Sequence, residues 1–196
     1  MSDLSRASRN RVLEAAKTVF ARHGFRRASM EDIAREAGAS RQSVYQWFGN
    51  KRAVFQALAA VITVEALAAA DAAWPEAATL PEGLPAAILA KDLPLYRFLH
   101  ASPHGAELLA VDESLTAAMA TDLEARFAAL LAAKALSRRE CGELDLSAFD
   151  GPEDFGTTVA RLASSLKATA VSEDDYTDGV RRLCRLIATA TSRGAG

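Results

Sequence analysis

Glycine residues divide the first fifty positions into segments that are each about one helix long. Gly24 and Gly38 stand where a left-handed residue commonly ends a helix, and Gly49 ends a third segment. Ser29 and Ser40 stand at the starts of the second and third segments, where a serine hydroxyl can cap a helix. Between these signals, apolar residues recur three and four positions apart. The spacing predicts helices over about residues 8–23, 30–37 and 41–48, and a fourth helix from about residue 51.

The rest of the chain shows the same helical spacing of apolar residues, without the strict alternation of a half-buried strand. A long pattern covers about 112–139, and two amphipathic segments follow a loop predicted over 142–152. Prolines predict interruptions in the middle of the chain. Pro75, Pro81 and Pro85 mark a connector over about 75–85, and Pro94 and Pro103 break the next segment into short pieces. We expect an all-α protein with about nine helices.

Charge is distributed unevenly along the chain. The net charge of −2 alone argues against a general nucleic-acid-binding protein. Residues 1–60, however, carry eleven Lys and Arg against five Asp and Glu, whereas the remainder carries twelve against twenty. A basic N-terminal end on an acidic body is the asymmetry expected when one end contacts phosphate.

The sequence contains no evident secretion signal or membrane span. The N-terminal residues lack the apolar region of a signal peptide. Apolar stretches are interrupted by charge or proline well short of the roughly 20 residues that a membrane helix needs. Cys141 and Cys184 are too few for a disulfide framework. We expect a soluble, cytoplasmic protein with no membrane partner.

Two short helices joined by a turn that contains Gly38 are typical of a helix-turn-helix. The second helix of this motif enters the major groove of DNA, and its N-terminal residues face the base edges. We expect Val44 and Phe48 to point into a small core and the other side chains of 41–48 to point outward. The alternative is a three-helix module that binds another protein, because helical hairpins are common.

The outward side chains suit DNA recognition. Arginine and glutamine read purines through paired hydrogen bonds. Lys51 lies in the first turn of the fourth helix, where it opposes the helix dipole and could neutralise a phosphate. Backbone N–H groups at the starts of the second and third helices are further phosphate donors. The candidate DNA-contacting residues are Ser29, Ser40, Arg41, Gln42, Ser43, Tyr45, Gln46, Trp47 and Lys51.

The segment from Phe25 to Lys51 resembles the DNA-binding signature of the tetracycline-repressor (TetR) family. The matching elements are Ile33-Ala34, Ala37-Gly38, Ser40, Tyr45, Phe48 and Lys51. Ser29 stands where the family commonly has threonine and Ala39 where it commonly has valine, and both substitutes can fill the same role. The specific resemblance covers about residues 8–58, and beyond it only the helical layout is similar.

The resemblance implies a helix-turn-helix DNA-binding domain over 1–56 and a helical ligand-binding and dimerisation domain over 57–196. It implies a repressor without a cofactor, which binds a palindromic operator as a homodimer and is released by a small effector. The last two long helices of the family usually pair across a two-fold axis, and the two amphipathic segments at the end of this chain agree with that. Their apolar stripes could instead pack only within the subunit. The candidate dimer contacts are Leu162, Leu166, Leu183 and Ile187.

Apolar and aromatic residues in the middle of the chain are candidate effector contacts. They are Trp74, Leu89, Tyr96, Phe98, Leu99, His100, Met119, Leu123 and Phe127. Such side chains suit a pocket for a largely apolar or aromatic ligand. They also suit a hydrophobic core, which is the commoner role for any one of them.

Other functions have less support in the sequence. His100 and His104 are four residues apart and could hold a metal on one helix, but Pro103 and Gly105 argue against a continuous helix there, so we predict no metal site. Cys141 and Cys184 could form a redox switch, although buried cysteines act more often as small apolar residues. The sequence lacks a P-loop, a nucleophile elbow and a zinc-protease motif, so we predict no enzyme.

Overall fold

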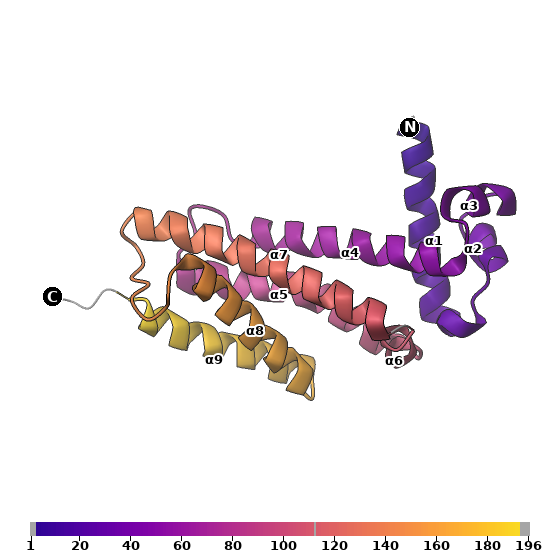
Figure 1. The fold of residues 1–196 in the computed structure, drawn as a ribbon. Helices are drawn as coiled ribbons and strands as arrows, with labels where there is room; N and C mark the ends of the chain where they lie inside the picture. Colours follow the sequence, from indigo (N-terminus) through magenta and orange to yellow (C-terminus); the bar gives the residue numbers. More distant parts are fainter. Residues whose placement is uncertain (1–2, 112, 193–196) are drawn as a thin grey trace. The chain divides into compact units, whose positions relative to one another are not determined.

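The computed structural model describes residues 3–111 and 113–192, and helices are the only regular elements in these ranges (Figure 1). The nine helices of these residues are α1 (Asp3–Arg27), α2 (Met30–Glu36), α3 (Arg41–Phe48), α4 (Lys51–Ala73), α5 (Leu80–Ala101), α6 (Gly105–Leu109), α7 (Glu113–Glu140), α8 (Pro152–Thr169) and α9 (Glu173–Ala190). The all-α prediction is therefore confirmed.

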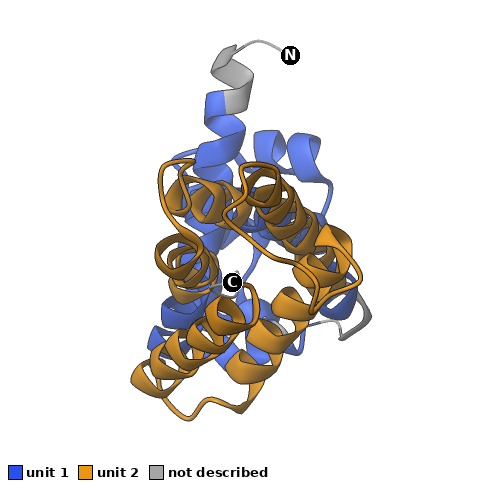
Figure 2. Cartoon of the chain, turned by 90° about the vertical axis from the view of Figure 1, so that its left-hand side faces the viewer, with its two compact units in different colours: residues 1–64, 95–119 blue, residues 65–94, 120–196 orange. Residues whose placement is uncertain are grey.

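The chain packs as two compact units that interleave along the sequence (Figure 2). Unit 1 comprises residues 1–64 and 95–119, and unit 2 comprises residues 65–94 and 120–196. Residues 95–119 therefore pack with the N-terminal helices although they lie far from them in sequence. The functional boundary expected after residue 56 stays a prediction.

Unit 1 has its own hydrophobic core, formed by one face from each of α1 to α4. Val12, Ile33 and Val44 are fully buried at its centre. Leu108 of α6 belongs to the same cluster and is only 5% exposed, so the segment after α5 completes this core. The rings of Phe20, Phe25 and Phe55 pack in tilted and edge-on arrangements with centroids 5.5 to 5.9 Å apart, which ties the C-terminal end of α1 to α4.

The ends of α2 and α3 follow the signals in the sequence, whereas α1 runs from Asp3 to Arg27 with a kink at Gly24 and so extends beyond the predicted range of 8–23. Ser29 caps α2: its hydroxyl accepts the Asp32 N–H at 3.1 Å, and the Asp32 carboxylate accepts the Ser29 N–H at 3.1 Å. Ser40 caps α3 in the same way, by accepting the N–H of Ser43 at 3.0 Å. Gly38, in the turn between α2 and α3, has a φ of 60°, which glycine adopts at little cost.

Helix α5 begins at Leu80 and runs unbroken through Pro85 and Pro94. The predictions that a connector extends to about residue 85 and that Pro94 breaks the next segment are therefore wrong. A proline inside a helix removes one hydrogen bond and costs about 3 kcal/mol. The stripe of Leu84, Ala87 and Ile88 is fully buried in the core of unit 2. Burial of this stripe outweighs the local cost, and such long-range packing cannot be read from the prolines themselves.

Unit 2 is built around a second core to which α4, α5, α7, α8 and α9 all contribute. Phe127, Leu131, Val159 and Val180 are each at most 1% exposed. Gly156 of α8 approaches the backbone of α7 so closely that a Cβ there would overlap the carbonyl oxygen of Ala128. The two helices therefore cross at a distance that only glycine permits.

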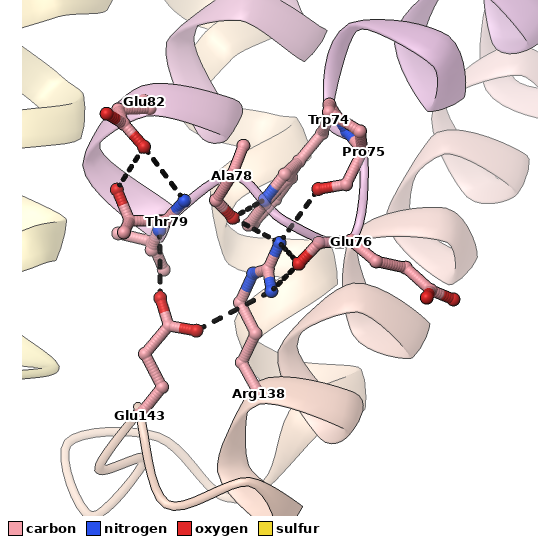
Figure 3. A network of polar contacts seen from close by, with 9 residues as sticks. Trp74, Pro75, Glu76, Ala78, Thr79, Glu82, Arg138 and Glu143 are labelled. Carbon is pink, nitrogen blue, oxygen red and sulfur yellow. Dashed lines mark hydrogen bonds and ion pairs between the residues drawn. The ribbon is translucent and has the colours of Figure 1, made fainter.

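Arg138, near the end of α7, fixes the turn between α4 and α5 within unit 2 (Figure 3). Its side chain is 7% exposed, and its guanidinium donates hydrogen bonds to the backbone carbonyls of Pro75, Glu76 and Ala78. The Glu143 carboxylate lies 3.5 Å from the guanidinium and accepts the N–H that begins α5. One arginine thus donates hydrogen bonds to backbone carbonyls of the turn, which have no partner within a helix.

Helix α4 has a longer apolar stretch than we expected from the sequence. By length and composition alone it could cross a membrane, since an 18-residue window has a mean hydropathy of 1.9. The expectation that all apolar stretches fall well short of a span is therefore wrong. Val54 and Leu58 pack in the core of unit 1, and Ala70 packs in the core of unit 2. Core helices commonly have this composition, so the observation is weak evidence for a membrane.

Candidate nucleic-acid interface

Helix α3 presents one buried face and one exposed face. Val44 and Phe48 anchor it in the core of unit 1, with exposures of 0% and 8%. The opposite face carries four exposed side chains, Arg41, Gln42, Tyr45 and Gln46. A short, capped helix with an exposed polar face has the dimensions and the donors needed to read a major groove.

Arg41 and Tyr45 are held close together on the exposed face of α3. The Arg41 guanidinium lies 5.4 Å from the centre of the Tyr45 ring and pairs with the Glu31 carboxylate at 2.6 Å. The Arg41 side chain is 64% exposed, so these contacts orient it without removing it from solvent. An oriented arginine loses less entropy when it binds an acceptor on DNA.

The predicted serine contacts also have structural roles. Ser29 and Ser40 accept backbone hydrogen bonds as N-caps, and the Ser43 hydroxyl lies 2.8 Å from that of Ser40. Hydrogen bonds from Ser29 lower the pKa of Asp32, so the carboxylate of the capping box stays ionised near neutral pH. Contacts from these serines to phosphate would be additional to their capping roles.

Trp47 differs from the outward orientation expected from the sequence. It is half-buried and packs against the core of unit 1. The reason is its position three residues after Val44, which places it on the edge of the buried face. Gln46, in contrast, lies on the exposed face.

Lys51 is directed into the protein in this structure. Its ammonium group donates to the carbonyl oxygens of Phe25, Arg26 and Ala28 at 2.6, 3.2 and 2.7 Å. Partial burial lowers the pKa of Lys51 despite the nearby Glu107 carboxylate. A contact between this side chain and phosphate, as predicted, would require at least one of these three bonds to be exchanged.

Glu107 of α6 is a positioning residue that the sequence analysis missed. Its carboxylate accepts the backbone N–H of Arg26 at 2.8 Å and lies against Gly24, where φ is 73°. Ser102 adds a hydrogen bond of 2.8 Å to the carbonyl oxygen of Ala21. These contacts fix the turn that leads into the helix-turn-helix. Nothing in the local sequence distinguishes Glu107 from other surface acids, because its partners lie about eighty residues away.

The predicted effector residues are divided between the two units. Four lie in unit 2, namely Trp74, Leu89, Leu123 and Phe127, and five lie in unit 1, namely Tyr96, Phe98, Leu99, His100 and Met119. Trp74 and Phe127 are fully buried, and Phe98 and Leu99 pack against the core of unit 1. His100 is exposed and stacks on Tyr96 with ring centroids 3.8 Å apart.

A groove of about 350 Å³ lies between α7 and α8 in unit 2. Alanines form much of its lining, with Glu124, Glu153 and Arg161 as its charged residues. None of the predicted effector residues lines it. The structure therefore shows free volume at a place that the sequence did not indicate.

The predicted dimer contacts differ in exposure. Leu162 of α8 is 43% exposed, whereas Leu166 and Leu183 are half-buried against the core of unit 2 and Ile187 is 6% exposed. Leu162 is therefore accessible to a second subunit. Leu186, one position before Ile187, is 70% exposed and adds an apolar side chain that the prediction omitted.

The two histidines that were considered as metal ligands contact different groups. The Nδ1 of His100 donates to the carbonyl oxygen of Tyr96, and His104 lies 3.5 Å from Glu107. Among the described residues, no group of three or more potential ligands is placed to hold a metal ion.

Comparison with known proteins finds similarity over the segment that contains the exposed helix α3. Residues 12–58 match the family described as bacterial regulatory proteins, tetR family. The HTH-type transcriptional repressor SCO4008 of Streptomyces coelicolor is 45% identical over 49 residues, which are 25% of this chain and 26% of the relative. The uncharacterized HTH-type transcriptional regulator YfiR of Bacillus subtilis is 47% identical over 45 residues, which are 23% and 22%. The similarity to these two relatives thus spans about a quarter of their length.

The fold is similar over nearly the whole chain. The crystal structure of a transcriptional regulator from Cytophaga hutchinsonii has a TM-score of 0.73 at 15% identity, covering 93% of this chain and 97% of that one. At this identity the likeness shows the fold alone. The two curated relatives are named as regulators of transcription, and neither is named as an enzyme. Residues 12–58 are therefore similar to bacterial regulatory proteins of the tetR family, and the fold of nearly the whole chain is similar to that of a solved transcriptional regulator.

Proposed function

We propose that this protein is a transcriptional regulator that binds a palindromic operator as a homodimer and inserts α3 of each subunit into the major groove. The observation that carries the proposal is the exposed face of Arg41, Gln42, Tyr45 and Gln46 on a helix anchored by its opposite face. Two copies related by a two-fold axis would reach successive major grooves, about 34–36 Å apart. The similarity of residues 12–58 to a DNA-binding domain supports this role.

A gel-shift assay on the DNA upstream of the protein's own gene tests the proposal. We expect Gln42→Ala to weaken specific binding by about 1–3 kcal/mol, because glutamine reads a base edge through paired hydrogen bonds. We expect Tyr45→Ala to weaken binding to all sequences. Gln56→Ala is the matched control, because Gln56 is an equally exposed glutamine on α4. Wild-type affinity in both α3 variants would contradict the proposal.

We further propose that the protein is a repressor released by a small effector. Release requires the effector to bind one conformation more tightly than the other. Helix α4 is suited to transmit such a change, because residues 51–64 belong to unit 1 and residues 65–73 to unit 2. Trp74, Leu89, Leu123 and Phe127 are the candidate effector contacts that share unit 2.

We place the protein in the cytoplasm, where operator DNA is accessible. Val54 and Leu58 of α4 pack in the core of unit 1 and Ala70 packs in the core of unit 2, as in a core helix of a protein without a membrane span. A cell fractionation in which the protein remained in the membrane pellet after a high-salt wash would contradict this.

A further inference from the structure

A group of four charged and polar side chains lies in unit 2, and three of the four are buried. It consists of Lys91 and Asp92 of α5, Lys167 of α8 and Tyr176 of α9, and we call it the ionic centre. Lys91 is 5% exposed, Asp92 3% and Tyr176 1%. Charged residues are rarely buried to this extent, because removing an ion from water costs several kcal/mol unless partners compensate it.

The Asp92 carboxylate is the hub of the ionic centre. One of its oxygens accepts from the ammonium groups of Lys91 at 2.8 Å and Lys167 at 2.6 Å. The other oxygen accepts the Tyr176 hydroxyl at 2.6 Å. Burial acts to raise the pKa of Asp92, but Lys91 and Lys167 together lower it by more than burial raises it. The net pKa is therefore lowered, and the carboxylate is ionised.

The charges of the ionic centre do not balance. Two ammonium groups share one carboxylate, and Tyr176 is neutral because burial and the adjacent Asp92 raise its pKa. The centre therefore has a net charge of +1. Glu124 of α7 is a further acid whose charge acts on Lys91, but it forms no ion pair with either lysine among the described residues. Burial and the repulsion from Lys167 lower the pKa of Lys91 against the attraction of Asp92.

Lys91 also has hydrogen-bonding capacity left over. An ammonium group carries three N–H donors. In the described part of the chain, Asp92 is the one hydrogen-bond acceptor of Lys91, and the ammonium lies 4.7 Å from the centre of the Phe127 ring. Unmade hydrogen bonds of a buried charged group are costly, so the arrangement favours a further acceptor beside Lys91.

We propose that the ionic centre binds the carboxylate group of the effector, with Lys91 and Lys167 as its cationic contacts and the Phe127 ring beside its apolar part. A monovalent carboxylate balances the excess positive charge and supplies the missing acceptors. The groove between α7 and α8 belongs to the same unit, and Glu124 of its lining is the acid whose charge acts on Lys91, although the four residues of the ionic centre do not themselves line the groove. The inference rests on the proposed response to an effector, and it narrows the expected ligand from apolar or aromatic to an apolar or aromatic acid.

A purely structural ion cluster would have different properties. Its role would be to join α5, α8 and α9, so it would discriminate little between an acid and the corresponding neutral amide. A binding site for a carboxylate has to discriminate between them. The comparison of an acid with its amide therefore separates the two explanations.

The experiment measures binding to the full chain without DNA, by calorimetry and by the shift in Tm. The probes are acetate against acetamide and benzoate against benzamide, at fixed pH and ionic strength. We expect each acid to bind at least tenfold more tightly than its amide. We expect Lys91→Met and Lys167→Met each to weaken acid binding at least tenfold and to leave amide binding unchanged.

Lys134→Met is the matched control for these variants. Lys134 belongs to unit 2 and pairs with Asp71 at 2.6 Å, outside the ionic centre. Lys167 is 34% exposed, so its variant tests the proposal even if Lys91→Met does not fold. Equal binding of acid and amide by the wild type, or undiminished acid binding by Lys167→Met, would overturn the proposal.

A gel shift on the same variants separates this proposal from the proposed function. Equal binding of acid and amide by a wild-type protein that binds its operator would overturn the carboxylate site alone. Acid discrimination in a protein that binds no operator would leave the carboxylate site standing and contradict the proposed DNA-binding function.

Discussion

Several residues do more in this fold than their sequence neighbourhood indicates. Lys51 was expected to face phosphate, but it donates to three carbonyl oxygens of the turn between α1 and α2. Arg138 similarly donates to carbonyls of the turn between α4 and α5. In both cases the acceptors are backbone atoms of distant residues, so no side-chain pattern in the sequence could identify them.

Arg138→Met should lower the free energy of unfolding by about 3–5 kcal/mol, because it leaves the turn carbonyls and the Glu143 carboxylate without their cation. Urea unfolding measures the change. Arg139→Met, at the neighbouring exposed position, should stay within about 0.5 kcal/mol of the wild type. Equal effects of the two substitutions would show that the carbonyl contacts contribute little.

The two cysteines should differ strongly in reactivity. Burial raises the pKa of the Cys184 thiol to about 12, whereas Cys141 is exposed. A thiol reagent at pH 8 should therefore label Cys141 rapidly and Cys184 only after unfolding, because the thiolate is the reactive form. Cys141→Ser should remove the rapid phase. A rapid phase that persists in this variant would contradict the assigned burial of Cys184.

At the scale of single elements, local signals predicted the helix-turn-helix well and packing decided the remainder. Ser29 and Ser40 each cap a helix as expected, because a cap is formed within four consecutive residues. Helix α3 has the expected bounds for the same reason. The prediction that Pro94 breaks a helix was wrong because the helix is stabilised by burial of α5 against α7, α8 and α9. The docking of α6 through Leu108 and Glu107 has no local signal at all.

The contact between α6 and the end of α1 makes a prediction for two glycines. Gly24 and Gly38 both have positive φ values, of 73° and 60°. A Cβ at Gly24 would overlap the Glu107 carboxylate, whereas one at Gly38 meets no atom within 4 Å. Gly38→Ala should cost about 1 kcal/mol of unfolding free energy from backbone strain alone, and Gly24→Ala should cost more.

The double variant Gly24→Ala, Glu107→Ala supplies the control for this prediction. It removes the overlapping carboxylate, so the loss should be smaller than the sum of the two single substitutions. Thermal unfolding of the four proteins measures the coupling. Strictly additive losses would mean that Glu107 does not lie against Gly24.

At the scale of the whole molecule, the sequence predicted an all-helical fold and the bounds of α3, but not how the chain divides. A boundary after residue 56 follows from the extent of a local motif. The structure groups residues 95–119 with the N-terminal helices instead of with their sequence neighbours. Such a grouping can be recognised only when it is known which distant residues share a core. The apolar pattern of Phe98, Leu99 and Leu108 does not decide this, because it is equally compatible with either unit.

The dimer interface expected from the sequence at α8 and α9 gives a prediction for the assembled protein. Leu162→Glu should shift the protein from dimer to monomer in light scattering after gel filtration, because a charge would be buried at the interface. Leu162 is 43% exposed in the single chain, so the subunit itself should stay folded. Val64→Glu is the control, since Val64 is an apolar residue of α4 that is 56% exposed. An unchanged dimer in Leu162→Glu would place the interface elsewhere.

The interleaving of unit 1 has a practical consequence for chimeric regulators made by joining the DNA-binding end of one protein to the effector-binding body of another. A donor segment that stops at residue 56 or 64 leaves behind Leu108, which fills the N-terminal core, and Glu107, which holds the turn after α1. The recipient would have to supply an equivalent leucine and carboxylate at the matching helical positions. Grafts that transfer residues 95–119 together with the N-terminal segment should therefore retain operator affinity, and grafts of the N-terminal segment alone should lose it.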